Sequence, residues 1–310
     1  MAIVAVAGGT GAVGRTLEAN ISAQSRVQHL CVNYSNVDQI SSTLRENDIQ
    51  VVVSALVLLD EKTSDSQINL IRASAQSGTV SKFIPSEYHL DFHVPIQGIE
   101  LSFKSYQLRS EEELERHPQL TWTLIRNGLF LDYLAMPFHP KPTNLMPWSI
   151  FVDLQHEICV LPGDGTQMMV FTHSADLAAI VERLIDIPGD RWPRESLIEG
   201  NKFQLKDLIQ ILERVTGKSF TVIYDSVEDI QRGQITQLPS NRDLFAQEQW
   251  GNLYQLVEKE AMFTLLSDGY NLGGESLMDM FPEVQITRIE TFLRDAWTCK
   301  SQADPKQSCI

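Results

Sequence analysis

The strongest chemical signal in the sequence is a cluster of glycines near the N-terminus. Gly9, Gly11 and Gly14 match the pattern G-x-G-x-x-G. Such glycines make a tight turn, let the backbone approach a pyrophosphate and let a helix pack closely on a strand. A helix starting here would also offer unpaired N–H groups to phosphates. The sequence therefore predicts a dinucleotide-binding loop rather than a plain turn. The residues expected to contact the cofactor are Gly8, Gly9, Thr10, Gly11, Ala12, Val13, Gly14 and Arg15.

A second group of residues carries acid–base side chains. Glu87, Tyr88 and His89 follow an apolar run at residues 80–84 that Pro85 ends. Ligands of open parallel sheets lie at the carboxyl ends of the strands, so Pro85 is an expected cofactor contact. All three side chains after it can exchange protons and are candidate catalytic residues, with loop hydrogen bonds as the alternative role. Ser54, near the end of the apolar run 49–56, is expected to face the cofactor.

Alternating strands and helices must position these residues. The pattern predicts a doubly wound parallel sheet with helices on both faces, an α/β fold. Residues 1–133 are expected to form the dinucleotide-binding core. Residues 134–310 are expected to form a smaller, more helical substrate region that returns some elements to the core. Four prolines between residues 136 and 148 predict a loop or lid.

The individual elements follow from apolar periodicity. Strands are predicted at residues 3–7, 27–32, 49–56, 80–84, 120–125 and 158–161, with a turn at 162–165. Helices are predicted at 15–23, 35–47 (capped by Ser35 or Asn36), 67–77, 101–116, 176–187, 205–216, 227–234, 252–266 and 286–296.

Composition narrows the classes of partner. The 310 residues include 25 Lys and Arg against 40 Asp and Glu, a net charge of −15, with no basic run. This balance argues against nucleic acid and anionic membranes as partners, and no apolar stretch is long enough to span a bilayer. The four cysteines are scattered, so we expect reduced thiols and no metal site. The N-terminus leaves no room for a signal peptide, and a cytoplasmic location is expected.

Several motifs occur in an order typical of one protein family. They are GGTGAVGR at residues 8–15, FIPSEY at 83–88, LTWTLIRNGLF at 120–130, PGDG at 162–165, FTHSAD at 171–176, GNK at 200–202 and FP at 281–282. Over nearly the whole chain the sequence resembles the NmrA-like and isoflavone reductase-like proteins. This resemblance implies an atypical short-chain dehydrogenase with a Rossmann-like core. The family holds NADPH-dependent reductases of aromatic natural products, regulators that bind dinucleotides without turnover, and tailoring enzymes of fungal pathways.

The resemblance also implies roles for individual residues. The family's reductases use a lysine early in the helix after the Pro-Ser-Glu turn, which makes Lys104 the candidate for catalysis and cofactor contact. However, the spacing between Lys104 and Thr121 places this lysine about one helical turn earlier in the sequence than the family's lysine. Asn127 is implied to contact the cofactor and Phe130 the substrate. Tyr88, Trp148 and Met169 complete the candidate substrate contacts, with core packing as the alternative. The Tyr-x-x-x-Lys pair of typical short-chain dehydrogenases is missing from the sequence.

The region that normally decides cofactor choice is unusual. About 20 residues past the first glycine, no acidic residue stands between His29 and Asn33 to hold a ribose. Arg15 and Arg26 could instead meet a 2′-phosphate. Residues 27–36 resemble the family's third strand, so the second strand and its basic turn are missing. Alternatively, residues 27–32 replace the second strand in a narrower sheet. NADPH is the expected cofactor, with NAD left open.

These observations favour an NADPH-dependent reductase of a hydrophobic aromatic or heterocyclic small molecule, in fungal-type secondary metabolism. Lys104 would assist charge or proton handling. Two alternatives stay open. One is a tailoring enzyme that couples imine-type reduction to isomerisation or cyclisation without net cofactor use. The other is a non-catalytic dinucleotide-sensing regulator, which the displaced Lys104 favours. An oligomer or a regulatory protein partner is also compatible with the sequence.

Overall fold

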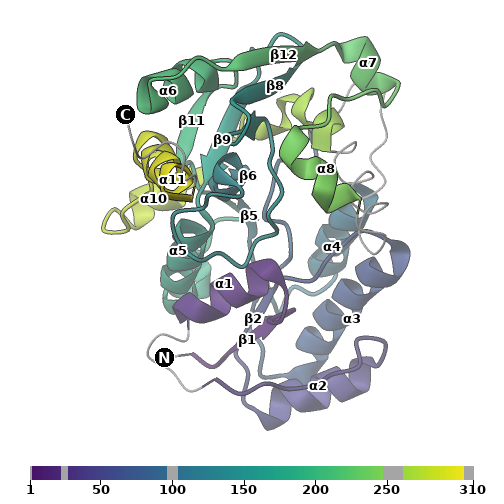
Figure 1. Ribbon diagram of the computed structural model, residues 1–310. Coiled ribbons are helices and arrows are strands. Elements are labelled where there is room, and N and C mark those ends of the chain that lie inside the picture. The colour runs from purple at the N-terminus through teal and green to yellow at the C-terminus, as the bar shows by residue number, and fades with distance from the viewer. Residues whose placement is uncertain (1, 22–26, 96–103, 247–260, 304–310) are drawn as a thin grey trace.

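A four-stranded parallel sheet forms the centre of the N-terminal half. It is seen in a computed structural model that describes residues 2–21, 27–95, 104–246 and 261–303 (Figure 1). The strands lie in the order β1 (Val4–Ala7), β2 (Val51–Ser54), β3 (Lys82–Ile84) and β4 (Thr121–Trp122). All four residues of β2 are buried, as its unbroken apolar run predicts.

A second, three-stranded sheet follows the first along the chain. The strand predicted at 120–125 is divided at Thr123 into β4 and β5 (Leu124–Arg126). β5 pairs in parallel with β10 (Glu195–Leu197), which pairs with β13 (Glu275–Ser276). The two halves of the chain are therefore joined through shared strands.

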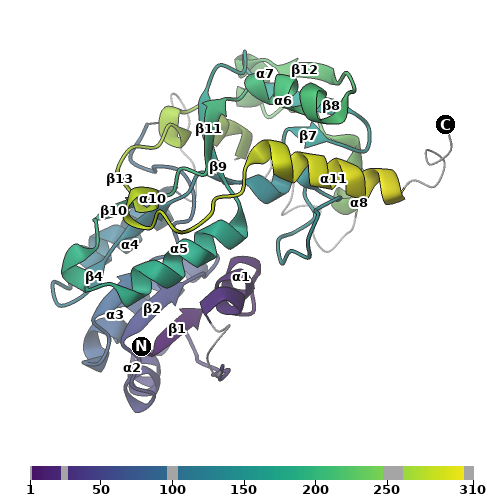
Figure 2. The same ribbon diagram turned by 90° about the vertical axis from the view of Figure 1, so that its left-hand side faces the viewer.

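Helices cover both faces of the sheet (Figures 1 and 2). On one face α2 (Val37–Glu46), α3 (Glu61–Ser77) and α4 (Lys104–Glu115) pack around Val52 of β2. On the other, α1 (Ala12–Ile21) and α5 (Ser174–Asp186) pack around its neighbours Val51 and Val53. Alternate residues of one strand thus enter opposite layers of the core. This arrangement confirms the predicted doubly wound α/β fold.

The strand predicted at residues 27–32 does not form. These residues are irregular, and Val27 and Leu30 are 42% and 45% exposed. β1 pairs with β2 along one edge, and no strand in the described ranges pairs with its other edge. A strand needs a hydrogen-bonded neighbour, and residues 27–32 reach none. The structure thus fits a missing second strand and not a replaced one.

The C-terminal half mixes strands with helices. One sheet has the order β11 (Asn201–Gln204), β9 (Met168–Thr172), β6 (Leu129–Phe130), and another the order β12 (Thr221–Asp225), β8 (Ile158–Pro162), β7 (Val152–Asp153). The helices are α6 (Asp207–Thr216), α7 (Val227–Gln231), α8 (Pro239–Phe245), α10 (Leu277–Met280) and α11 (Ile289–Ala303), with 3₁₀ turns η1 (Leu131–Ala135), η2 (Gly189–Arg191) and η3 (Asp268–Tyr270).

Most predicted elements of this half are present with shifted ends, while the helix predicted at 252–266 lies largely outside the described residues. None of the helices in the described ranges has both the length and the apolar character needed to cross a membrane.

Candidate active site

The glycine loop joins β1 to α1 as the sequence predicts. The Gly11 N–H donates to the Gly8 carbonyl at 2.8 Å, and Gly8 has a φ of +79°. A Cβ atom built on Gly14 would lie 2.1 Å from the Gly8 oxygen, so this position requires glycine for packing. A Cβ on Gly11 would lie 3.2 Å from the same oxygen, and Gly11 is exposed. Packing alone hardly requires glycine at position 11, whereas close approach of a ligand does.

The first turn of α1 follows this loop directly. Ala12, Val13 and Gly14 form that turn, whose N–H groups have no partner within the helix. Thr10 and Arg15 are exposed beside them. The predicted loop residues are therefore together, at the positive end of a helix dipole.

Tyr34 is a neighbour of the loop that sequence reasoning missed. Burial raises the pKa of Tyr34, and a hydrogen bond from the Gly8 backbone opposes that shift. Asn69 donates from Nδ2 to the Tyr34 carbonyl at 2.9 Å. Asn69 also lines an open hollow of about 600 Å³ whose other lining residues are Ser35, Asp60, Glu61, Lys62, Asp65 and Ser66. The hollow beside the loop thus carries three carboxylates and one lysine.

The ends of β2 and β5 carry buried polar atoms without protein partners. Tyr88 donates its hydroxyl to the Ser54 carbonyl at 2.9 Å, while the Ser54 Oγ has no partner among the described residues. Asn127 is fully buried and donates from Nδ2 to the Gly128 carbonyl, but its Oδ1 likewise has no partner there. Buried polar atoms are normally satisfied, so these two are suited to meet a polar ligand.

Gly128 shapes the turn behind Asn127. Its φ is +69°, and a Cβ there would lie 2.1 Å from the Val170 carbonyl oxygen. Pro85 is buried at the end of β3, and its carbonyl accepts the Glu87 N–H at 2.9 Å. Tight backbone turns therefore follow both strands at the carboxyl edge.

Glu87 lies in a buried cluster of charges. Its Oε1 is 3.9 Å from Nε of Arg126, a side chain that is 1% exposed. Arg126 also meets Asp91 at 3.1 Å and Glu195 of β10 at 3.2 Å. Burial raises the pKa of Glu87 to about 8, against the opposing effect of Arg126. A neutral Glu87 at pH 7 agrees with its separation from Arg126, which is too long for a hydrogen bond.

His89 pairs with a residue from the far end of the chain. Its Nε2 lies 2.8 Å from the hydroxyl of Tyr270, which is fully buried. Burial lowers the pKa of His89 to about 4, so the imidazole is neutral at pH 7. The His89 carbonyl accepts the Gly128 N–H and thus ties the loops after β3 and β5 together. Tyr270 was not a sequence candidate, because nothing in its surroundings signals this contact.

Lys104 is the first residue of α4. Its Nζ donates to the Val94 carbonyl at 3.2 Å, across the undescribed residues 96–103. The described contacts of Lys104 do not include any other candidate residue.

Of the candidate substrate residues, Phe130 and Trp148 belong to one aromatic row. Phe130 packs edge-on against Tyr133 with ring centroids 6.4 Å apart, and Tyr133 against Trp148 at 5.9 Å. The Nε1 of Trp148 is buried and has no partner among the described residues. Met169 is instead fully buried in the core of the C-terminal half, opposite Phe203 in the β9–β11 pair.

The sequence of the chain is similar to that of a fungal oxidoreductase. No protein-family model matches the chain. It is 51% identical to the "Oxidoreductase swnN" of Arthroderma benhamiae over 324 residues, which cover 98% of this chain and all of the relative. That alignment is longer than the 310 residues of this chain, so the relative has residues that this chain lacks.

Solved structures share the fold at low sequence identity. The complex of leucoanthocyanidin reductase with NADPH from Vitis vinifera aligns with a TM-score of 0.71 at 16% identity, covering 95% of this chain and 99% of that one. An isoflavone reductase crystal structure aligns with a TM-score of 0.66 at 18% identity, covering 94% and 97%. Both likenesses extend over the core and the C-terminal half alike.

Proposed function

The chain belongs to the NmrA-like and isoflavone reductase-like oxidoreductases, and on this premise we propose that it is an NADPH-dependent reductase of a hydrophobic aromatic or heterocyclic small molecule. The observation that carries the proposal is the glycine loop. Gly11 is exposed, and a Cβ added there would meet only the Gly8 oxygen, at 3.2 Å.

The residues of the carboxyl edge fit a nicotinamide dinucleotide. The glycine loop and the first turn of α1 would hold its pyrophosphate, because their N–H groups and helix dipole favour anions. The partnerless Ser54 Oγ and Asn127 Oδ1 would meet polar groups of the cofactor. When bound, the cofactor supplies the hydride. An acidic protein would thus hold an anion through local backbone dipoles.

The substrate class rests on the aromatic row. Phe130, Tyr133 and Trp148 form a largely buried aromatic row next to the end of β6, and edge-on ring contacts of this kind favour an aromatic or heterocyclic partner. The partnerless Trp148 Nε1 would donate to an acceptor atom on that partner. A role in secondary metabolism would suit such a substrate.

Proton and charge handling is assigned to Lys104 and His89. Lys104, once freed from the Val94 carbonyl, would stabilise negative charge that develops on the substrate. His89 is neutral and hydrogen-bonded to Tyr270, so the pair can pass a proton through the histidine ring. Tyr88 is the weaker candidate, because its hydroxyl is committed to the Ser54 carbonyl.

Turnover with site variants tests this assignment. NADPH oxidation is followed with a panel of aromatic carbonyl, ether and cyclic imine substrates, and products are identified by mass spectrometry. We expect Lys104→Met to lower kcat by about 100-fold, while Lys218→Met, at an exposed site after α6, matches the wild type. Equal turnover in both variants contradicts the role of Lys104. Product formed without net loss of NADPH would identify the redox-neutral tailoring enzyme. Cofactor binding without any turnover would identify the non-catalytic regulator.

A further inference from the structure

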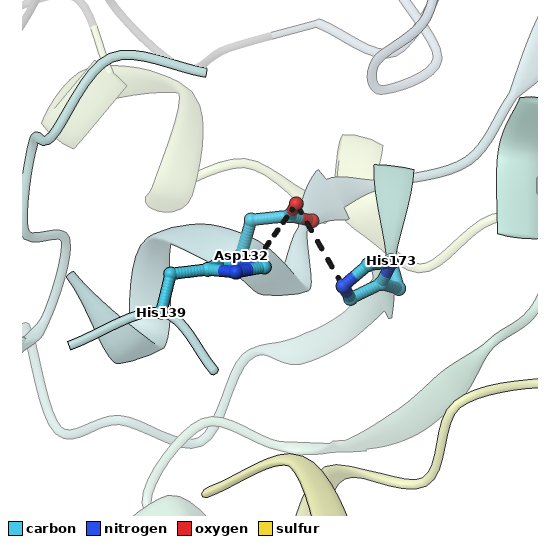
Figure 3. Close-up of side chains that lie close together, drawn as sticks. All are labelled: Asp132, His139 and His173. Carbon is cyan, nitrogen blue, oxygen red and sulfur yellow. Dashed lines mark hydrogen bonds and ion pairs between the residues drawn. The ribbon is translucent and has the colours of Figure 1, made fainter. Parts of the chain in front are cut away.

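Three side chains from separate segments converge beyond the ends of two strands. Asp132 lies in η1, two residues after β6, and His173 directly follows β9. β6 and β9 are parallel neighbours, so both residues lie at their carboxyl ends. His139 comes from the proline-rich loop that follows η1 (Figure 3). We propose that Asp132, His139 and His173 form a binding site for a divalent transition-metal ion such as Zn²⁺.

The spacing of the donor atoms supports this assignment. Asp132 Oδ1 lies 3.3 Å from His139 Nε2 and 3.9 Å from His173 Nε2, and all three atoms lie within 4.8 Å of one another. Tetrahedral Zn²⁺ with bonds of about 2.0–2.1 Å places its ligand atoms about 3.3 Å apart. The first pair already has this separation, and the second needs a shift of about half an ångström. Two imidazoles and one carboxylate favour Zn²⁺, Co²⁺ or Fe²⁺ over Mg²⁺ and Ca²⁺.

The surroundings fix the donors in place. Asp132 is fully buried and accepts the Ser174 N–H at 2.9 Å and the Ser174 hydroxyl at 2.7 Å. The two imidazole side chains are 5% and 11% exposed, and Phe292 packs edge-on against both rings. Such buried outer contacts orient ligands in metal sites.

The tautomer of His139 suits its Nε2 to bind a cation. Its Nδ1 lies 2.5 Å from the Lys141 carbonyl oxygen, so this nitrogen carries the hydrogen. The Lys141 N–H also approaches Nδ1, but at the longer distance of 3.3 Å. In the neutral ring, Nε2 then directs its lone pair at Asp132 Oδ1. Two acceptors facing each other at 3.3 Å require a cation or a proton between them. A metal-bound histidine usually donates its other N–H to a carbonyl or carboxylate, as His139 does.

His173 needs a rearrangement to bind. Its Nδ1 accepts the Ala175 N–H at 3.1 Å, so Nε2 carries the hydrogen in the metal-free protein. Coordination through Nε2 moves that hydrogen to Nδ1 and gives up the bond to Ala175, with no net proton released by this ring. Asp132 and His139 are therefore the ligands expected to bind first.

A bound ion would fasten the proline-rich loop. That loop reaches α1, where the Asn144 amide meets the Thr16 hydroxyl at 3.5 Å, and its Leu145 is buried in the core between α1 and α5. Joining His139 to η1 and α5 through a metal would hold this loop against the first helix. The expected consequence is a more stable protein when the ion is bound.

Metal titration of the untagged full chain tests the proposal. We expect one Zn²⁺ per chain with a Kd of about 10 μM or tighter, a higher Tm on binding, and visible absorption bands when Co²⁺ is added instead. His139→Ala, a change in the loop rather than the core, should weaken Zn²⁺ binding by about 100-fold. His156→Ala is the matched control, since His156 pairs with Asp153 at 3.0 Å without a second histidine ligand.

Either of two results overturns the site. One is no Zn²⁺ binding above that of the His139→Ala variant. The other is equal loss of binding in His139→Ala and His156→Ala. In both cases the contact between His139 and Asp132 is a side-chain hydrogen bond without a metal ion. The readouts do not depend on cofactor binding or turnover, so their failure leaves the reductase assignment unaffected.

Discussion

Glu87 and Arg126 show how burial can outweigh an opposite charge. Arg126 attracts three carboxylates, yet removal from water raises the pKa of Glu87 from 4.5 to about 8. In the unfolded chain the same carboxyl group ionises near its ordinary value. The native and unfolded states therefore bind different numbers of protons between pH 4.5 and 8.

This difference predicts how stability depends on pH. Because the native state keeps a proton on Glu87 that the unfolded state loses, Glu87 lowers the free energy of unfolding by about 1.4 kcal/mol per pH unit across that window. Glu87→Gln mimics the neutral form and removes this term. Urea unfolding from pH 5 to pH 8 should show that the free energy of unfolding of the variant rises relative to that of the wild type as pH increases. A constant difference between the two proteins would contradict the raised pKa.

Gly14 should differ sharply from glycines in open surroundings. A Cβ at Gly14 meets the Gly8 backbone, which has no flexible end to move aside. Gly14→Ala should therefore lower the free energy of unfolding by about 1–3 kcal/mol. Gly273→Ala is the control, because nothing lies within 4 Å of its added Cβ. Denaturant unfolding of both variants measures the effect, and equal stabilities would show that α1 packs less closely on β1 than described.

At the scale of elements, sequence patterns succeed where local interactions decide. The unbroken Val51–Val53 run gives the buried β2, and Asn36 caps α2 by accepting the Gln39 N–H, one of two predicted caps. Residues 27–32 were also predicted to form a strand but form none, because a strand depends on a neighbour that periodicity does not show. The resemblance to the family's third strand already pointed to this missing neighbour.

The missing second strand should affect cofactor choice. If residues 27–36 correspond to the family's third strand, the turn that normally holds the 2′-phosphate is missing, and the hollow beside Tyr34 carries three carboxylates and one lysine. An ionic hydrogen bond to a phosphate contributes about 1.5–3 kcal/mol, so without one we expect NADPH and NADH affinities within about tenfold of each other. Isothermal titration with each cofactor measures the ratio. A preference for NADPH of about 1000-fold would mean that Arg15, or a basic residue outside the described ranges such as Arg26, meets the 2′-phosphate.

The whole molecule is held together by contacts between its two halves. β10 pairs with β5, which follows β4 along the chain, and Lys82 of β3 donates from Nζ to the carbonyls of Ile185 and Ile187 at the C-terminal end of α5. Arg126 adds an ion pair to Glu195 of β10. The halves are therefore expected to unfold in one cooperative step.

Hydrogen exchange at increasing urea concentrations tests this cooperativity. Peptides covering β2 and β8 should lose protection at the same urea concentration. Arg126→Met, which removes the buried guanidinium shared by Glu87, Asp91 and Glu195, should lower that midpoint for both peptides. Separate midpoints for the two peptides would show that the halves are independent domains.

The sequence could not predict side-chain contacts between segments that lie far apart along the chain. The glycine loop and the candidates at strand ends were found because short motifs and the fold rule locate them. Tyr270 beside His89, and His139 beside Asp132 and His173, depend on tertiary packing that leaves no local pattern. Arg126 was detectable in principle, since a charged residue within an apolar strand requires buried partners.

Titration of the purified protein with NADPH tests the central claim most directly. We expect one cofactor per chain with a Kd of about 1–100 μM. Gly11→Ala should weaken binding by about tenfold or more while lowering the Tm far less than Gly14→Ala, because its Cβ would lie 3.2 Å rather than 2.1 Å from the Gly8 oxygen but enters the path of the pyrophosphate. No binding by the wild type up to about 1 mM NADPH, or unchanged binding by Gly11→Ala, would contradict the assignment of this loop as the cofactor site.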